Sequence, residues 1–134
     1  MYLYEHNILT HSEQQMTKVT NRIREDIEKS GVDSGIVVVF SPHTTAGFTI
    51  NENADPDVVY DILHGFEEVF PTRKEWYRHL EGNSHAHMKT TMVGASQILI
   101  LSGGELILGI RQDLYFCEFD GPRQRKFYVK IIEG

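Results

Sequence analysis

Two short stretches of this sequence carry most of the side chains that could do chemistry. Residues 41–57 (SPHTTAGFTINENADPD) hold His43, two threonines and a run of amide and carboxyl groups, and residues 82–94 (GNSHAHMKTTMVG) hold His85 and His87. A plain core strand has no use for so many donors, acceptors and titratable groups, whereas loops at the ends of rigid elements commonly carry binding and catalytic residues. We therefore predict that His43 and His87 meet in one cleft, within a subunit or between neighbouring subunits.

Three of the seven histidines are informative. His85 and His87 form an H-x-H pair, which would place both imidazoles on one face of an extended segment but roughly 160° apart on a helix. The local sequence favours a helix, so we expect only one of the two to face a shared site. His87 is the first choice and His43 the second. The other four are interpreted as surface or packing residues: His6, His11, His64 and His79.

The candidate ligands of a divalent metal ion, zinc or magnesium, are His43, His85 and His87. A neutral imidazole suits zinc, and Glu52 or Asp55 could supply an oxygen ligand. A metal-free site is the alternative, in which His43 or His87 is a general acid or base near neutral pH and Glu52 orients it. In a third interpretation the histidines only satisfy polar loops. No diagnostic spacing such as H-E-x-x-H decides between the three.

Groups near these histidines could bind a phosphate. Lys89 lies two positions after His87, and a helix that begins near Asn83 would offer free backbone N–H groups. Arg123 follows an Asp-Gly-Pro turn, where a fixed backbone could aim its guanidinium at a phosphate in a bidentate manner. An ion pair with Asp120 or Glu118 is the alternative for Arg123.

The pattern of apolar residues predicts the elements that hold these groups. Val19, Ile23 and Ile27 recur every four residues, which predicts an amphipathic helix over 17–30. A second helix should begin at Pro56 with Asp55 as its cap and stop before Pro71. Its apolar side chains cover more than one narrow face, so we expect this helix to be central rather than peripheral.

The remaining chain reads as strands, turns and one irregular stretch. The apolar run 36–40 predicts a strand buried on both faces. Residues 71–84 have no clear period, and we interpret them as a subunit contact or a lid. A short helix is expected from residue 85 to about 95, and further strands are expected at 97–101, 105–108, 110–119 and 126–132. Strands without regular βαβ alternation indicate an α+β fold with a mixed, largely antiparallel sheet.

Composition limits the classes of protein that this chain could be. Its 134 residues form one domain, with 40% hydrophobic and 24% charged residues. No apolar run approaches the roughly 18 residues of a membrane span, and residues 1–9 do not read as a signal peptide. We expect a cytoplasmic protein without a membrane partner. A net charge of −6 argues against nucleic-acid binding. The single cysteine, Cys117, lies in a strand-like run and is interpreted as a buried small hydrophobe.

The runs SPHTTAGFTINENADPDVVYDI, GNSHAHMKTTMVG and LYFCEFDGPRQRKFYVKI resemble the YjbQ-like family, many members of which are named secondary thiamine-phosphate synthases. This resemblance implies an α+β subunit in which a strongly curved sheet wraps around a central helix, assembled as a homotrimer with sites near subunit boundaries. It also points to Gln112 as a site-lining amide. The chain departs from the family at His85, where the family usually has an acidic residue, and at Arg111, where it usually has an aromatic residue.

The function that we expect is a small metal-assisted enzyme acting on a phosphorylated heterocyclic metabolite, of which thiamine-phosphate synthesis is the named example. The alternatives are a metal-dependent hydrolase of a phosphate or amide bond, and a non-catalytic trimeric protein that binds a metal or small anion. The expected catalytic residues are His43, His87 and Glu52. The expected substrate-binding residues are Thr44, Thr45, Asn51, Asn53, Lys89, Gln112 and Arg123.

Overall fold

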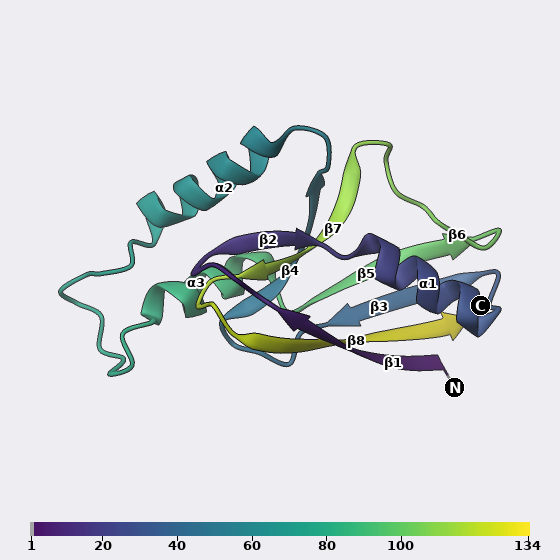
Figure 1. Cartoon of the computed structure of the whole chain (residues 1–134), viewed down its shortest axis with the longest axis horizontal. Coiled ribbons are helices and arrows are strands. Elements are labelled where there is room, and N and C mark those ends of the chain that lie inside the picture. The colour runs from purple at the N-terminus through teal and green to yellow at the C-terminus, as the bar shows by residue number, and fades with distance from the viewer. Residues whose placement is uncertain (1) are drawn as a thin grey trace.

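The computed structural model describes residues 2–134 as three helices and eight strands. Figure 1 shows two antiparallel sheets with the helices around them. The elements follow one another as β1 (Tyr2–Leu9), β2 (Gln15–Lys18), α1 (Thr20–Ser30), β3 (Gly35–Phe40), β4 (Ala46–Glu52), α2 (Pro56–Val69), α3 (Ser84–Val93), β5 (Ser96–Ser102), β6 (Glu105–Leu106), β7 (Gln112–Glu118) and β8 (Gln124–Glu133).

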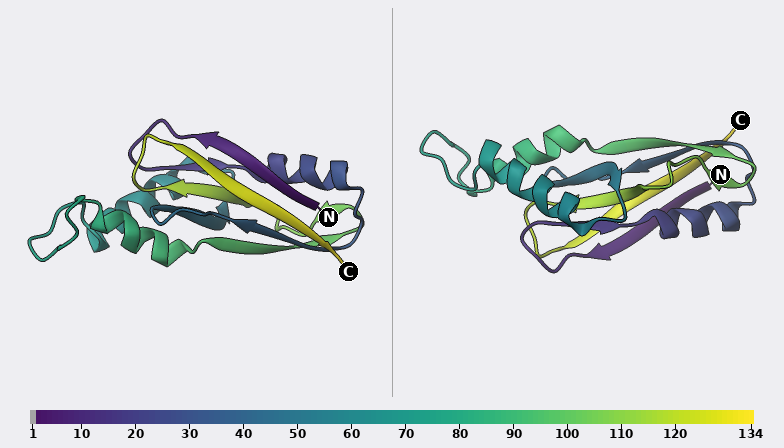
Figure 2. Two further views of the ribbon diagram at one scale, coloured as in Figure 1. Left: turned by 90° about the horizontal axis from the view of Figure 1, so that it is seen from below. Right: turned by 90° about the horizontal axis from the view of Figure 1, so that it is seen from above.

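The larger sheet has the strand order β1-β8-β3-β5-β6, and the smaller sheet has the order β2-β7-β4. Every strand pairing is antiparallel, for example with Val39 of β3 opposite Val129 of β8. Figure 2 shows from below and from above how the strands curl past one another. The predicted α+β class with a curved sheet is therefore confirmed, and the pairing is fully antiparallel rather than mixed.

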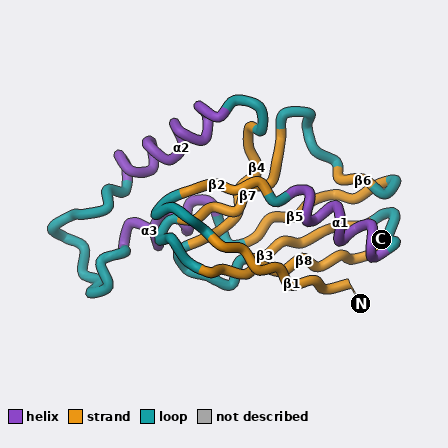
Figure 3. Tube along the Cα trace, in the orientation of Figure 1, coloured by secondary structure: helices purple, strands orange, loops and turns teal. Residues whose placement is uncertain are grey.

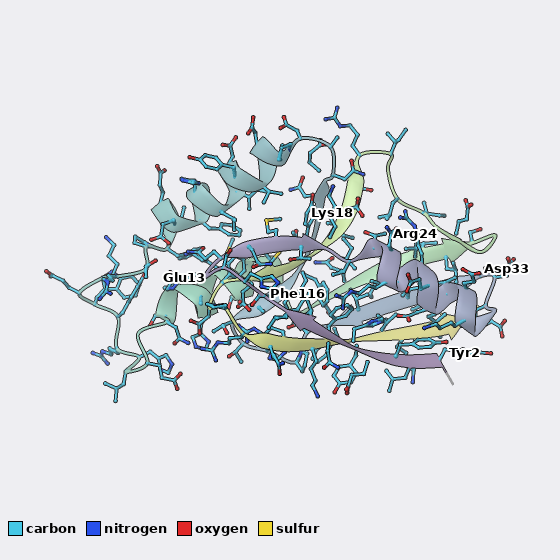
Figure 4. All side chains as sticks on the ribbon, viewed as in Figure 1. Tyr2, Glu13, Lys18, Arg24, Asp33 and Phe116 are labelled. Atoms are coloured by element: carbon cyan, nitrogen blue, oxygen red, sulfur yellow. The ribbon has the colours of Figure 1, made fainter. Side chains whose placement is uncertain are left out.

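The main core lies where apolar side chains of the two sheets and of α1 meet. Phe48 of the smaller sheet meets Phe127 of the larger one edge to face, with ring centroids 5.4 Å apart. Phe116, labelled in Figure 4, belongs to the same cluster, and Ile23 and Ile27 of α1 close it. Burying a side chain of this size contributes about 1.5–3 kcal/mol, so this cluster is a main source of stability.

The second helix, α2, is peripheral, which corrects the expectation that it would be central. Asp55 caps it through the backbone N–H of Asp57 at 2.9 Å, and it ends before Pro71 as predicted. However, none of its residues is buried. One face packs on the smaller sheet through Val59, Leu63 and Phe66, while other apolar side chains stay exposed. Figure 1 shows α2 above the sheet rather than enclosed by it. Its wide apolar surface is thus only partly covered in one subunit.

The strand β3 also differs from its prediction, because only one of its faces is buried. Val37 and Val39 point into the core, whereas Ile36 and Phe40 are 38% and 45% exposed. The outer face of the larger sheet therefore presents apolar side chains to the surroundings of the subunit.

The irregular segment that was predicted at 71–84 spans residues 70–83 in the structure, and we name it the excursion. Figure 3 shows it as a loop that extends from the body between α2 and α3. Trp76 and Leu80 within it are 67% and 99% exposed. Among the described residues, no helix is long and apolar enough to cross a membrane.

Candidate functional site

A buried ion pair forms the centre of the polar region where β7 leads into β8. Arg125 Nε donates to Glu118 Oε1 over 2.8 Å, and both side chains are almost completely inaccessible to solvent. Arg125 also donates to Thr45 Oγ1, and Thr10 Oγ1 donates to Glu118 Oε1, each over 2.8 Å. Buried charges are tolerated when they are paired and their remaining donors and acceptors are satisfied. This pair therefore fixes Thr45, a predicted site residue, from inside the protein.

His43 lies at the edge of this ion pair. Its Nε2 atom is 3.1 Å from both the backbone nitrogen and the carbonyl oxygen of Lys126. Burial and the positive charge of Arg125 lower the pKa of His43 below its ordinary value. His43 is therefore neutral at physiological pH and half-buried, while the neighbouring Thr44 is exposed.

Asn83 and Asp120 extend the polar network to the start of α3. The backbone nitrogen of Asp120 donates to Glu118 Oε2 over 2.9 Å, and Asn83 Nδ2 donates to Asp120 Oδ2 over 2.7 Å. Arg123 pairs with the same Asp120 oxygen at 2.9 Å, so it forms the ion pair that was the alternative to a phosphate contact. The buried Oδ1 of Asn83 has no partner among the described residues. A buried acceptor normally receives a hydrogen bond, so a water molecule or a ligand is expected to donate one to this oxygen.

Lys89 is engaged inside the protein rather than free for a phosphate. Its side chain is fully buried, and its ammonium lies within 3.1 Å of three acceptors. One of them is Nδ1 of His85, which is itself only 2% exposed. Burial, and next the charge of Lys89, lower the pKa of His85. The predicted role of Lys89 as a phosphate contact has no support in this arrangement.

His87 has different surroundings from His85, because residues two positions apart on a helix point to different sides. Its ring meets that of His79 edge to face, with centroids 5.2 Å apart and planes at 82°. The two rings belong to a pocket of about 610 Å³ between α3 and the excursion. We name it the aromatic pocket, and it is lined by Trp76, Tyr77, Arg78, His79, Ser84, His87 and Met88.

The predicted residues at the end of β4 form a separate group. This strand has seven residues, so Glu52 lies about 20 Å along it from its first residue, which follows the loop of His43. Glu52 accepts hydrogen bonds from the backbone nitrogen of Ala54 and from Arg111, which lower its pKa. It therefore orients Arg111 and not His43 within one subunit. Its neighbours Asn51, Asn53 and Gln112 bond to nearby backbone groups.

The donor set of one subunit does not fit the predicted metal ion. Among residues 2–134, no three His, Cys, Asp or Glu side chains are grouped closely enough to hold an ion. His43 adjoins Lys126, His85 adjoins Lys89, and His87 adjoins His79. Residues 2–134 of a single subunit therefore do not supply a three-ligand metal site.

A family model described as UPF0047 protein YjbQ-like matches residues 4–134. The chain belongs to this family. Relatives of the YjbQ-like chain include the UPF0047 protein YugU of Bacillus subtilis, 50% identical over 93% of this chain and 95% of its own. A UPF0047 protein of Methanocaldococcus jannaschii is 48% identical over 97% of this chain and 94% of its own.

Two solved structures extend the likeness to the fold. An uncharacterised YjbQ/UPF0047 protein of Clostridium acetobutylicum has a TM-score of 0.94 at 52% identity, covering 96% of this chain and 99% of its own. A hypothetical protein of Aeropyrum pernix has a TM-score of 0.94 at 32% identity, covering all of both chains.

The sequence did not predict that four polar residues of the network contact one another, nor that His87 has an aromatic partner. Glu118 drew attention only as an alternative partner of Arg123, and Arg125 lies in a polar run (Arg-Gln-Arg-Lys) that gives no sign of burial. Asn83 and Asp120 drew attention only as a helix start and as an alternative partner of Arg123. His79 lies in the excursion, where its proximity to Trp76 was the only available signal.

Proposed function

We propose that this YjbQ-like protein acts on a phosphorylated heterocyclic metabolite whose ring binds in the aromatic pocket. The observation that carries the proposal is the pairing of His87 with His79 in a pocket beside Trp76. A volume of about 610 Å³ lies within the range of small-molecule sites, and aromatic walls suit a planar ring.

The same pocket offers positive groups for a phosphate. Ser84 lines it and is the first residue of α3, so the N-terminus of a ten-residue helix opens beside the ring position. Helix N-termini bind anions through free N–H groups and a partial positive charge. Arg78 also lines the pocket, and its guanidinium can hold a phosphate in a bidentate manner.

The two histidines supply the chemistry in this proposal. Each imidazole can act as a general base or a general acid, so one ring could accept a proton while the other donates one to the leaving group. In thiamine-phosphate synthesis, a thiazole phosphate replaces pyrophosphate on a pyrimidine methylene group. Arg78 and the start of α3 would stabilise the negative charge that develops on the leaving pyrophosphate.

We also propose that the protein is a cytoplasmic homotrimer with sites near subunit boundaries. The support is the apolar outer face of the larger sheet, where large side chains remain exposed in one subunit. A metal-assisted reaction would need donors from two subunits, because one subunit does not group three. The exposed side chains are Leu3, Ile36, Phe40, Ile98, Ile100 and Ile132.

Two alternatives stay open, namely metal-dependent hydrolysis and binding without catalysis. Protein purified without a polyhistidine tag would be analysed for metal and assayed for pyrophosphate release and for phosphoester hydrolysis, with and without a chelator. Pyrophosphate release that survives chelation and is lost in His87→Ala supports the proposal. Hydrolysis that is lost on chelation supports the second function, and a ligand-induced thermal shift without turnover supports the third.

The single tryptophan of the chain makes binding directly measurable. Trp76 lines the pocket, so a phosphorylated aminopyrimidine or thiazole should change its fluorescence, and the same ring without phosphate should bind at least about tenfold more weakly. His64→Ala is the matched control, because His64 stacks on Tyr60 of α2 and does not line the pocket. A signal that is equal in wild type and His87→Ala would overturn the proposed site.

A further inference from the structure

The buried ammonium of Lys89 has three acceptors from three parts of the chain. Its Nζ atom lies 2.8 Å from Glu67 Oε1 of α2, 3.1 Å from Gln14 Oε1 before β2, and 2.8 Å from His85 Nδ1 one turn earlier on α3. An ammonium has three protons to donate and no lone pair to accept with. The three contacts therefore use all of its donors.

From this geometry we infer that Lys89 is a positioning residue that fixes the proton of neutral His85 on Nε2. Because Nδ1 accepts from Lys89, it carries no proton of its own. A neutral imidazole has one ring proton, which must then reside on Nε2. His85 consequently presents a hydrogen-bond donor, and it lies in the first turn of α3.

The other protonation states conflict with the surroundings of Lys89. A doubly protonated His85 would turn an N–H group toward the ammonium and place two positive charges in contact. A neutral Lys89 would leave the carboxylate of Glu67 without its ion pair. The amide of Gln14 is oriented consistently, since its Nε2 atom points toward Glu67 at 3.4 Å while its oxygen faces Lys89.

With its proton on Nε2, His85 can bind a hydrogen-bond acceptor through that atom. Zinc could bind Nε2 of the neutral imidazole only if the ring proton moved to Nδ1, and the Lys89 ammonium prevents this move. Zinc could not bind Nδ1 either, because Lys89 already occupies that nitrogen. The partner of His85 is therefore an acceptor, such as a water oxygen or a single oxygen or ring nitrogen of a ligand. Because His85 is 2% exposed, that partner must be small or must reach into the protein. His85 does not line the aromatic pocket, so its tautomer does not depend on that site.

Long-range ¹H–¹⁵N correlation spectra of protein labelled with ¹⁵N-histidine at pH 7.5 test the inference directly. We expect Nε2 of His85 in the protonated range and Nδ1 in the unprotonated range, with signals assigned by their loss in His85→Asn. Addition of zinc should leave both shifts unchanged. A proton on Nδ1 in the wild type, or zinc-induced shifts at Nε2, would overturn the inference without any Lys89 variant having to fold.

Lys89→Met separates positioning from a purely structural role. If Lys89 positions the proton, the variant should lose the single pattern and show exchange between the two tautomers. Lys89→Arg should restore the pattern, because a guanidinium also only donates. Lys29→Met is the control on the exposed surface of α1. A folded Lys89→Met protein with the unchanged wild-type pattern would show that Lys89 is structural only.

Discussion

The ring of His79 from the excursion stands edge to face against the ring of His87 from α3, with their centroids 5.2 Å apart. This contact joins an irregular segment to a helix and defines one side of the aromatic pocket. It also means that the histidine first chosen from the sequence has a neighbour that the sequence did not suggest.

His79→Ala and His87→Ala should each weaken binding of the phosphorylated ring by about tenfold, because each removes one aromatic contact of the ring. Residues in contact are coupled, so the double variant should lose less than the sum of the two single losses, measured as free energies from Trp76 fluorescence titrations. Strictly additive losses would show that the two rings act independently.

Arg125→Met should lower the free energy of unfolding by about 3–5 kcal/mol, since it leaves the buried carboxylate of Glu118 without its partner. Replacing both residues with apolar ones should recover part of that loss. Arg111→Met is the comparison, because Arg111 is 65% exposed and its pair with Glu52 should contribute much less than the buried pair. Urea denaturation of the four proteins measures this, and equal losses for both arginines would contradict the prediction.

Glu67 should make stability depend on pH in the acid range. Partial burial opposes its ionisation, but hydrogen bonds from Lys89 and Thr72 prevail and lower its pKa from 4.5 to about 2. A depressed folded-state pKa stabilises the protein above about pH 4.5, and this contribution is lost as the pH falls toward 2. Because the side chain is 41% exposed, we expect only about 1 kcal/mol.

The comparison that isolates Glu67 is with its exposed neighbour Glu68. Between pH 5 and pH 3, the wild type and Glu68→Gln should lose the same stability, and Glu67→Gln should lose less. Denaturant midpoints at each pH measure the difference. Parallel pH profiles for both variants would show that Glu67 is not the titrating group.

Gly47→Ala and Gly65→Ala should change stability in opposite directions. A Cβ at Gly47 would lie 2.3 Å from the carbonyl oxygen of Gly94, so β4 and the end of α3 would have to separate. A Cβ at Gly65, within α2, meets nothing within 4 Å, and alanine is favoured over glycine in a helix by about 0.5–1 kcal/mol. Thermal unfolding should show a clear loss for the first variant and a small gain for the second.

A lysine at Ile98 or Ile100 should abolish the proposed trimer, because it places a charge in the apolar outer face of the larger sheet. Light scattering after size-exclusion chromatography should give three times the 15.4 kDa subunit mass for the wild type and the subunit mass for the variants. Ile110→Lys, at a site that is 95% exposed outside this face, should assemble like the wild type. A wild-type monomer would exclude the trimer.

Most helices and strands could be predicted from the sequence, because signals within a few residues determine them. The four-residue period of α1, the Asp55 cap and the glycine pair of the β5–β6 turn all act over a few residues. The place of α2 was predicted wrongly, since an apolar helix surface indicates contact without saying whether that contact lies in the same chain. The same ambiguity made β3 look buried on both faces.

The arrangement of the site was less predictable because it depends on pairs far apart in the chain. Lys89 contacts Gln14 from 75 positions away, and Arg125 contacts Thr45 from 80 positions away. The periodic pattern of apolar residues gives no information about such distant pairs. The helical interpretation of residues 85–95 did separate His85 from His87 correctly, because a two-residue spacing on a helix turns side chains to different sides.

The position of β8 between β1 and β3 has a consequence for biosynthesis. In the chain, β8 follows all the other described strands of the larger sheet and pairs with both β1 and β3, so β1 must wait for a partner that is more than a hundred residues away. During translation, β1 and β3 expose unpaired backbone edges that other nascent chains could capture. We therefore expect the demand for chaperones to last until β8 has left the ribosomal tunnel.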